Sequence, residues 1–157
     1  MILVVSGIVA GILGTAAMDL MNYLFSRAGM ISKIDIGVIG RMAAGWTKGR
    51  FYYRSPDEIE QIDHDIFYGY LAHYAIGVGF ALPYVMVWDL IIGGSPSPAW
   101  TIVYGIVTTA GPYFLIYPSM GLGIFGRRSP EGIKSTYSSL ANHFFFGIGM
   151  AAGILMV

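Results

Sequence analysis

Four long apolar runs dominate this 157-residue sequence, and they restrict the fold more than any motif does. The first run is MILVVSGIVAGILGTAAMDLMNYLF. At about 1.5 Å of rise per residue, about 20 apolar residues cross the hydrocarbon core of a bilayer as a helix. Runs of this length without polar alternation indicate helices, which satisfy their own backbone groups in lipid. The sequence predicts an all-α membrane protein, residues 1–157, with four spans at about 2–25, 66–92, 99–125 and 137–157.

The first run is not expected to be a cleaved signal peptide, because no basic segment precedes it and Asp19 interrupts it. The chain has no cysteine, which excludes disulfides, thiolate metal ligands and thiol nucleophiles.

Charge is scarce and unevenly placed. Charged residues make up 11% of the chain, against about a quarter in a typical soluble domain. All nine Lys and Arg fall between Arg27 and Arg54 or between Arg127 and Lys134. Basic connections stay in the cytoplasm, so we expect both termini on the periplasmic or outer side. The basic residues follow membrane topology, and no nucleic-acid partner is expected.

The first connection, residues 26–65, is too long for a simple loop and is expected to be structured. DIGVIGRMAAGW, Asp35 to Trp46, favours a short interfacial helix. Ser55-Pro56-Asp57-Glu58 is typical of a helix start with a capping box, from which the second span could run unbroken. The same opening recurs at Ser129-Pro130-Glu131, before the fourth span.

A nine-residue phrase occurs twice, as HYAIGVGFA from His73 and as HFFFGIGMA from His143. A Ser-Pro pair precedes each histidine, by 18 residues in one case and 14 in the other. We interpret the chain as two tandem helical hairpins related by a pseudo-two-fold axis along the membrane normal. The two histidines would then face one another across the bundle. The alternative is chance similarity between glycine-rich membrane helices, since the chain has 22 glycines.

One residue of each span is predicted to share a layer about 12–14 Å inside the cytoplasmic boundary, judging from its distance along the helix. These residues are Asp19, His73, Pro118 and His143. Neighbouring residues that would line the same layer are Thr15, Asn22, Gly77, Ser119, Asn142 and Gly147. A carboxylate at such depth costs several kcal/mol unless it is paired, so we expect Asp19 to bond to a histidine.

Three functions remain open for this layer, beside a purely structural role as interhelical hydrogen bonds. Asp19, His73, His143, Asn142 and Asn22 could bind or relay protons or a small polar solute, in a homo-oligomer or larger complex. The two histidines could instead ligate haem, or join Asp19 on a divalent metal. The protein could also be an accessory subunit of a larger membrane complex. An enzyme is not expected, because no nucleophile, phosphate-loop or metalloprotease pattern is present.

A weaker metal candidate lies in the first connection, where Asp57, Glu60 and His64 would share a helix face. A solvated acidic face near a helix start is the simpler interpretation.

The phrases LAHYAIGVGFALPY, PSMGLGIFGRRSP and HFFFGIGM resemble a family of small four-span bacterial membrane proteins, catalogued as a domain of unknown function. The resemblance covers essentially the whole chain. It implies a bacterial inner-membrane protein and supplies no activity.

Overall fold

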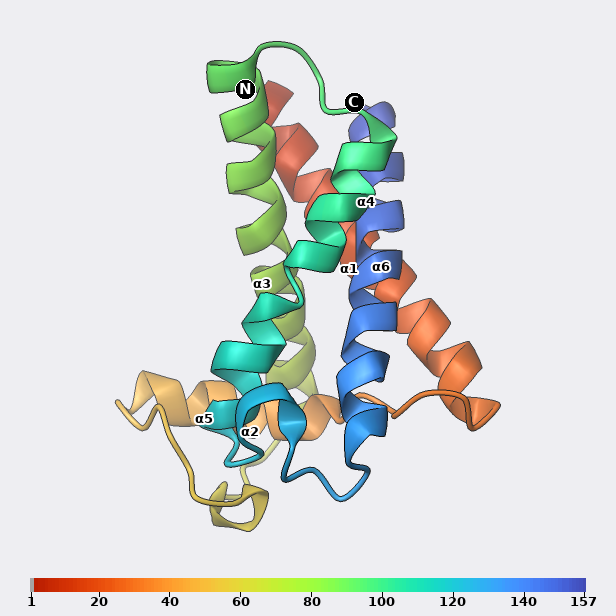
Figure 1. The fold of residues 1–157 in the computed structure, drawn as a ribbon. Helices are drawn as coiled ribbons and strands as arrows, with labels where there is room; N and C mark the ends of the chain where they lie inside the picture. Colours follow the sequence, from red (N-terminus) through yellow and green to blue (C-terminus); the bar gives the residue numbers. More distant parts are fainter. Residues whose placement is uncertain (1) are drawn as a thin grey trace.

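The computed structural model describes residues 2–157, which form helices and connections without β-strands in that range. Four segments are long and apolar enough to cross a membrane: α1 (Ile2–Arg27), Asp65–Ile92, Pro98–Ser119 and α6 (Ile133–Leu155). The second combines α3 (Asp65–Val87) with a π-helical end, η2 (Trp88–Ile92). Both ends of the chain lie opposite the short α2 (Ile36–Thr47), which crosses the base of the bundle (Figure 1). The predicted all-α class with four spans is confirmed.

The third span is not one continuous α-helix. It consists of α4 (Pro98–Val107), a turn, the π-helical η3 (Pro112–Ile116) and a single turn, α5 (Tyr117–Ser119). A proline inside a helix lacks the N–H that the ladder needs and crowds the preceding turn, so Pro112 accounts for the break. The span ends at Ser119, before the predicted residue 125. Gly121 follows at φ +79°, a conformation that glycine adopts without strain.

Glycines set the closest helix contacts of the bundle. A Cβ on Gly11 of α1 would lie 2.5 Å from the Cα of Val78 in α3. A Cβ on Gly105 of α4 would lie 2.4 Å from the Cα of Gly147 in α6. Small residues let membrane helices approach until their backbones touch. α1 therefore packs tightly between α3 and α6, and α4 packs against α6.

The packing does not show the predicted pseudo-two-fold relation between the hairpins. A two-fold axis would match the long α1–α6 contact with an equal contact between α4 and α3. Instead, α3 and α4 meet through a few side chains, such as the Tyr84 and Tyr104 rings stacked 4.2 Å apart. The glycines differ likewise: a Cβ on Gly149 would lie 2.4 Å from the Leu13 carbonyl oxygen. Gly79, its counterpart in the repeated phrase, has no such neighbour within 4 Å among the described residues.

The first connection contains the helix predicted for Asp35–Trp46, which is confirmed as α2. The Asp35 carboxylate caps it by accepting a hydrogen bond of 3.0 Å from the backbone N–H three residues later. α2 lies directly against the start of α3, where a Cβ on Gly40 would be 2.0 Å from the Asp65 carbonyl oxygen. Only a glycine allows that approach.

The helix start predicted at Ser55 is wrong. One 3₁₀ turn, η1 (Pro56–Glu58), forms there, and α3 begins only at Asp65. The Ser55 side chain caps no backbone N–H, so no capping box forms. The reason is tertiary, because Ile59 is 3% exposed and packs in a second apolar core with Met42. Burying Ile59 requires the chain to turn back instead of continuing as a helix.

The matching start predicted at Ser129 is also wrong. α6 begins at Ile133, after Gly132 at φ +55°. The Ser129 hydroxyl is hydrogen-bonded to the Ser135 hydroxyl, 2.7 Å away, and also accepts a 3.3 Å hydrogen bond from the Glu131 N–H. These local bonds form a turn and not the first turn of α6.

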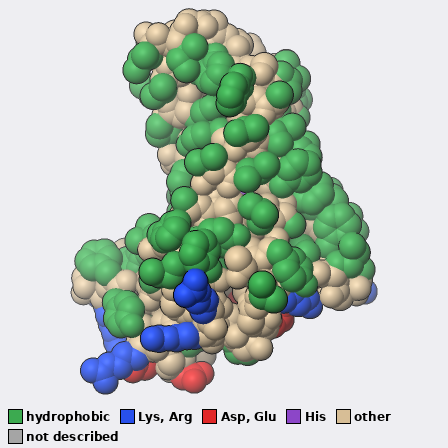
Figure 2. Space-filling view, in the orientation of Figure 1, with side chains coloured by type: hydrophobic (Ala, Val, Ile, Leu, Met, Phe, Trp, Pro, Cys, Tyr) green, Lys and Arg blue, Asp and Glu red, His purple; other side chains and the backbone are tan. Residues whose placement is uncertain are grey.

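Charged and apolar side chains occupy different parts of the surface along the bundle axis. Figure 2 shows lysines and arginines of the visible face gathered at the α2 end, with hydrophobic side chains along the membrane-spanning helices. Large apolar residues on the outside of the spans are strongly exposed, among them Leu20, Leu71, Val107 and Phe114. Such a surface suits lipid and not water. The chain is a multi-pass membrane protein.

Candidate functional site

A cavity of about 550 Å³ occupies the half of the bundle next to α2. Its walls come from α1, α3, η3 and α6, and its floor comes from α2 and the linker before it. The opposite half is filled, because Ala10, Ala81 and Met150 are 0% exposed there. The cavity is therefore closed toward the chain termini.

Asp19 and His73 form a pair between α1 and α3. The His73 Nε2 lies 3.1 Å from the Asp19 Oδ1, and the side chains are 14% and 23% exposed. The Tyr74 side chain lies beside the same carboxylate. The His73 ring lines the cavity, whereas Asp19 is not among its lining residues. Asp19 thus orients the ring from the helix interface and does not face the cavity.

His143 bonds to a residue that the sequence analysis missed. Its Nδ1 lies 2.8 Å from the hydroxyl of Thr108, which sits in the turn between α4 and η3. The same hydroxyl donates to the Gly105 carbonyl oxygen at 2.6 Å. The signal in the sequence was the polar pair Thr108-Thr109 in the middle of an apolar span. Asp19 therefore pairs with His73, and Thr108 pairs with His143. The three predicted residues do not form one cluster.

These bonds determine which nitrogen of each imidazole carries a proton. A carboxylate only accepts, so the His73 Nε2 donates to Asp19. The single hydroxyl proton of Thr108 goes to Gly105, so the His143 Nδ1 donates to Thr108. In the neutral rings, the His73 Nδ1 and the His143 Nε2 remain as acceptors.

Neither acceptor nitrogen has a hydrogen-bond partner within residues 2–157. In the same range, no fully buried side-chain nitrogen or oxygen lacks a partner, so both nitrogens reach open space. The cavity is the open space that both rings line. It can therefore offer two hydrogen-bond acceptors to an occupant.

Asn22 and Asn142 connect α1, α6 and the linker before α2. The Asn22 amide nitrogen donates to the Asn142 side-chain oxygen at 3.2 Å and to the Ser32 carbonyl oxygen at 2.9 Å. Its side-chain oxygen accepts from the backbone N–H of Ile34 at 3.1 Å. Asn22 is 5% exposed and fully occupied by these bonds, so its role is structural. Asn142 lines the cavity.

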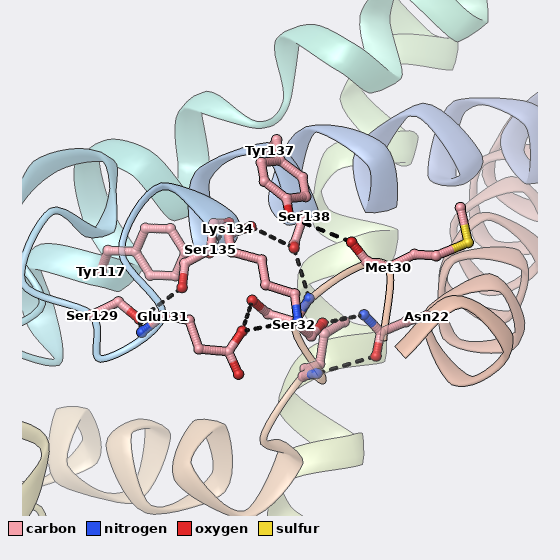
Figure 3. A network of polar contacts seen from close by, with 11 residues as sticks. Asn22, Met30, Ser32, Tyr117, Ser129, Glu131, Lys134, Ser135, Tyr137 and Ser138 are labelled. Atoms are coloured by element: carbon pink, nitrogen blue, oxygen red, sulfur yellow. Dashed lines mark hydrogen bonds and ion pairs between the residues drawn. The ribbon is translucent and has the colours of Figure 1, made fainter. Parts of the chain in front are cut away.

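Figure 3 shows a network of polar contacts that includes serines and Glu131, and Ser32, Glu131 and Ser138 of this network also line the cavity. The Ser32 N–H donates to the Ser138 hydroxyl at 2.7 Å, and the Ser32 hydroxyl bonds to the Glu131 carboxylate. These bonds link the linker before α2 to the loop before α6. Lys33, Asp35 and Glu131 are exposed and also line the cavity, so it opens at the charged end.

The other residues predicted to support the site lie in different places. Thr15 and Gly77 line the cavity, and a Cβ on Gly77 would be 2.0 Å from the Thr15 hydroxyl. Gly147 instead packs against α4, with a Cβ position 2.8 Å from the Ile102 Cα. Ser119, next to Pro118, holds the first connection against the end of the third span. Its hydroxyl accepts a hydrogen bond from the Trp46 indole N–H and donates one to the Phe51 carbonyl oxygen, both at 2.8 Å.

The described residues, 2–157, contain no group of three or more His, Asp or Glu side chains placed to hold a metal ion. Asp57, Glu60 and His64 do not share a helix, because only Asp57 lies in η1 and His64 adopts φ +58° before α3. Glu60 pairs with Arg50 at 3.2 Å.

The family model of a protein of unknown function, DUF2938, matches residues 8–157. The chain belongs to the DUF2938 family. The match includes both histidine phrases, the Thr108 turn and all residues of the cavity. The comparisons with curated proteins and with solved structures gave no match.

Proposed function

We propose that this protein binds a small amphipathic solute in the cavity beside α2. The apolar part of the solute lies against residues such as Met18, Phe80 and Ile116. Its polar part carries an N–H or O–H donor, which bonds to the free ring nitrogens of His73 and His143. The observation that carries this proposal is that both imidazoles line one cavity and each has one nitrogen committed to a helix partner.

The size and lining of the cavity support a molecule and not a bare proton. Ligand pockets commonly enclose about 300–1,000 Å³, with apolar walls and a few polar groups that fix orientation. The volume of about 550 Å³ lies within that range. A proton relay needs only a chain of polar groups or waters, and would not require Met18 and Phe80 at this position.

We further propose that the protein lies in a bacterial inner membrane with both termini outside and α2 in the cytoplasm. All nine basic residues lie at the α2 end, in the two connections or in the helix turns that border them, as the positive-inside bias requires. The cavity then opens to the cytoplasm or to the inner leaflet. Translocation would require a second conformation, because the half of the bundle near the termini is closed here.

Two probes that differ in hydrogen donors test the proposal. Dodecylamine carries N–H donors, and dodecyltrimethylammonium has the same chain and charge without them. Native mass spectrometry of the detergent-purified protein should show retention of the amine and little of the quaternary ion. His143→Phe keeps a ring but removes the acceptor, and should lower amine retention several-fold.

The third histidine supplies the control. His64 is exposed, lies outside the cavity and adopts a left-handed conformation that asparagine tolerates, so His64→Asn should bind as the wild type does. Equal retention of both probes, or an equal loss in His64→Asn, would refute the proposal. A Soret band in the purified protein would instead favour the haem alternative.

A further inference from the structure

A second pocket, of about 110 Å³, lies at the carboxyl end of α2, apart from the cavity. Its polar lining residues are Arg41, Lys48, Arg50, Tyr53 and Glu60. We infer that this pocket binds a phosphate group, and that an anionic phospholipid headgroup supplies it. The volume is about that of three or four water molecules, which suits one phosphate and not a larger group. This inference does not depend on the occupant of the cavity.

The hydroxyl of Tyr53 points to a ligand. Tyr53 is 2% exposed and lines this pocket, and its hydroxyl forms no hydrogen bond within residues 2–157. No fully buried side-chain oxygen in that range lacks a partner, so the hydroxyl must reach open space, and the pocket that Tyr53 lines supplies it. Such a hydroxyl is a free hydrogen-bond donor in the pocket. Gly45 allows the position, since a Cβ there would lie 1.9 Å from the hydroxyl oxygen. A phosphate oxygen in the pocket would accept the missing hydrogen bond.

The charges around the pocket favour an anion. Arg41 pairs with Asp65 at 3.4 Å and Arg50 pairs with Glu60 at 3.2 Å, while Lys48 has no ion pair among the described residues. Three cations against two carboxylates leave one positive charge. Each guanidinium has five N–H donors, so a single ion pair leaves others for a phosphate. The Arg50 guanidinium also lies 4.7 Å from the centre of the Tyr53 ring, which holds it beside the hydroxyl.

The surroundings favour a lipid as the source of the phosphate. Phe51 and Tyr52 follow Arg50 directly and are 65% and 59% exposed. Exposed aromatic residues at the charged end of a membrane bundle are typical of the headgroup region. Basic pockets at this depth commonly hold anionic headgroups.

Competition between two lipids tests the inference. The protein is purified with equal amounts of dioleoylphosphatidylglycerol and dioleoylphosphatidylcholine. Native mass spectrometry should show that it preferentially retains the anionic phosphatidylglycerol. Tyr53→Phe removes only the hydroxyl and should weaken this binding about five-fold, the value of one net hydrogen bond. Lys48→Gln removes the unpaired charge and should weaken it about ten-fold, as expected for a charged hydrogen bond.

Arg127→Gln is the matched control, because Arg127 is exposed in the other basic connection, and it should leave lipid binding unchanged. Titration of lipid-depleted protein with inorganic phosphate identifies the source. Phosphate binding that is sensitive to Tyr53→Phe, without lipid preference, would assign the site to free phosphate. The inference would be overturned if the protein showed neither lipid preference nor phosphate binding. It would also be overturned if Arg127→Gln weakened lipid binding as much as Lys48→Gln does.

Discussion

At the scale of single residues, each imidazole of the cavity has two different nitrogens. One nitrogen of His73 is committed to Asp19, and one nitrogen of His143 is committed to Thr108. These bonds fix the ring orientation and determine which nitrogen remains free. The carboxylate and the hydroxyl are therefore positioning groups, and the rings are the groups that would meet a ligand.

Thr108→Val should destabilise the protein by about 1–3 kcal/mol, because it leaves the buried His143 Nδ1–H without an acceptor. Thr108→Ser keeps a hydroxyl and should lose less. The free energy of unfolding in detergent, from denaturant titration of each variant, measures both effects.

Thr109→Val is the matched control for that prediction. Thr109 is 2% exposed, and its hydroxyl donates only to the Ile106 carbonyl oxygen, which the Thr109 N–H also reaches. If Thr109→Val costs as much as Thr108→Val, the bond to His143 contributes nothing measurable.

At the scale of elements, similar local sequences have different surroundings. The two histidine phrases both form regular helix, in α3 and α6. Gly77 and Gly147 occupy the fifth position of each phrase, and both touch the preceding span of their own hairpin. The seventh positions differ, because α6 packs along α1 whereas α3 does not pack along α4 in the same way.

Alanine substitutions at the seventh positions should therefore differ. Gly149→Ala places a methyl group 2.4 Å from the Leu13 carbonyl oxygen and should destabilise the bundle by about 1–3 kcal/mol. Gly79→Ala meets no atom of another described element within 4 Å and should leave stability unchanged or slightly higher. Thermal unfolding of the two variants in the same detergent checks this. Equal losses would mean that α3 packs against α4 as closely as α6 packs against α1.

At the scale of the whole molecule, polarity runs along the bundle axis. The charged end carries α2, the mouth of the cavity and all basic residues, and the opposite end carries the chain termini and the short turn at 93–97. A ligand would consequently meet the site from only one side of the membrane.

The absence of cysteine allows a direct test of orientation. Ser95 in the 93–97 turn and Gln61 in the first connection are both exposed. With both termini outside, Ser95→Cys should react with an impermeant maleimide in intact cells. Gln61→Cys should react only after the membrane is opened. The reverse pattern would place α2 and the cavity mouth outside.

The sequence by itself determined the four spans, their all-helical class, the separation of charge and the helix α2. Each depends on local properties, namely run length, hydropathy and a capping aspartate. The sequence also predicted that Asp19 bonds to a histidine, because an unpaired carboxylate is costly in lipid, and the structure selects His73 rather than His143.

Only the tertiary structure decided the rest. The helix predicted to start at Ser55 does not form, because burying Ile59 outweighs the local capping signal. The predicted two-fold relation of the hairpins is not seen, because α3 and α4 remain largely apart. Thr108 became the partner of His143 because the chain turns at that point, between α4 and η3. Whether two residues distant in sequence meet depends on how helices pack, and local sequence carries little information about that.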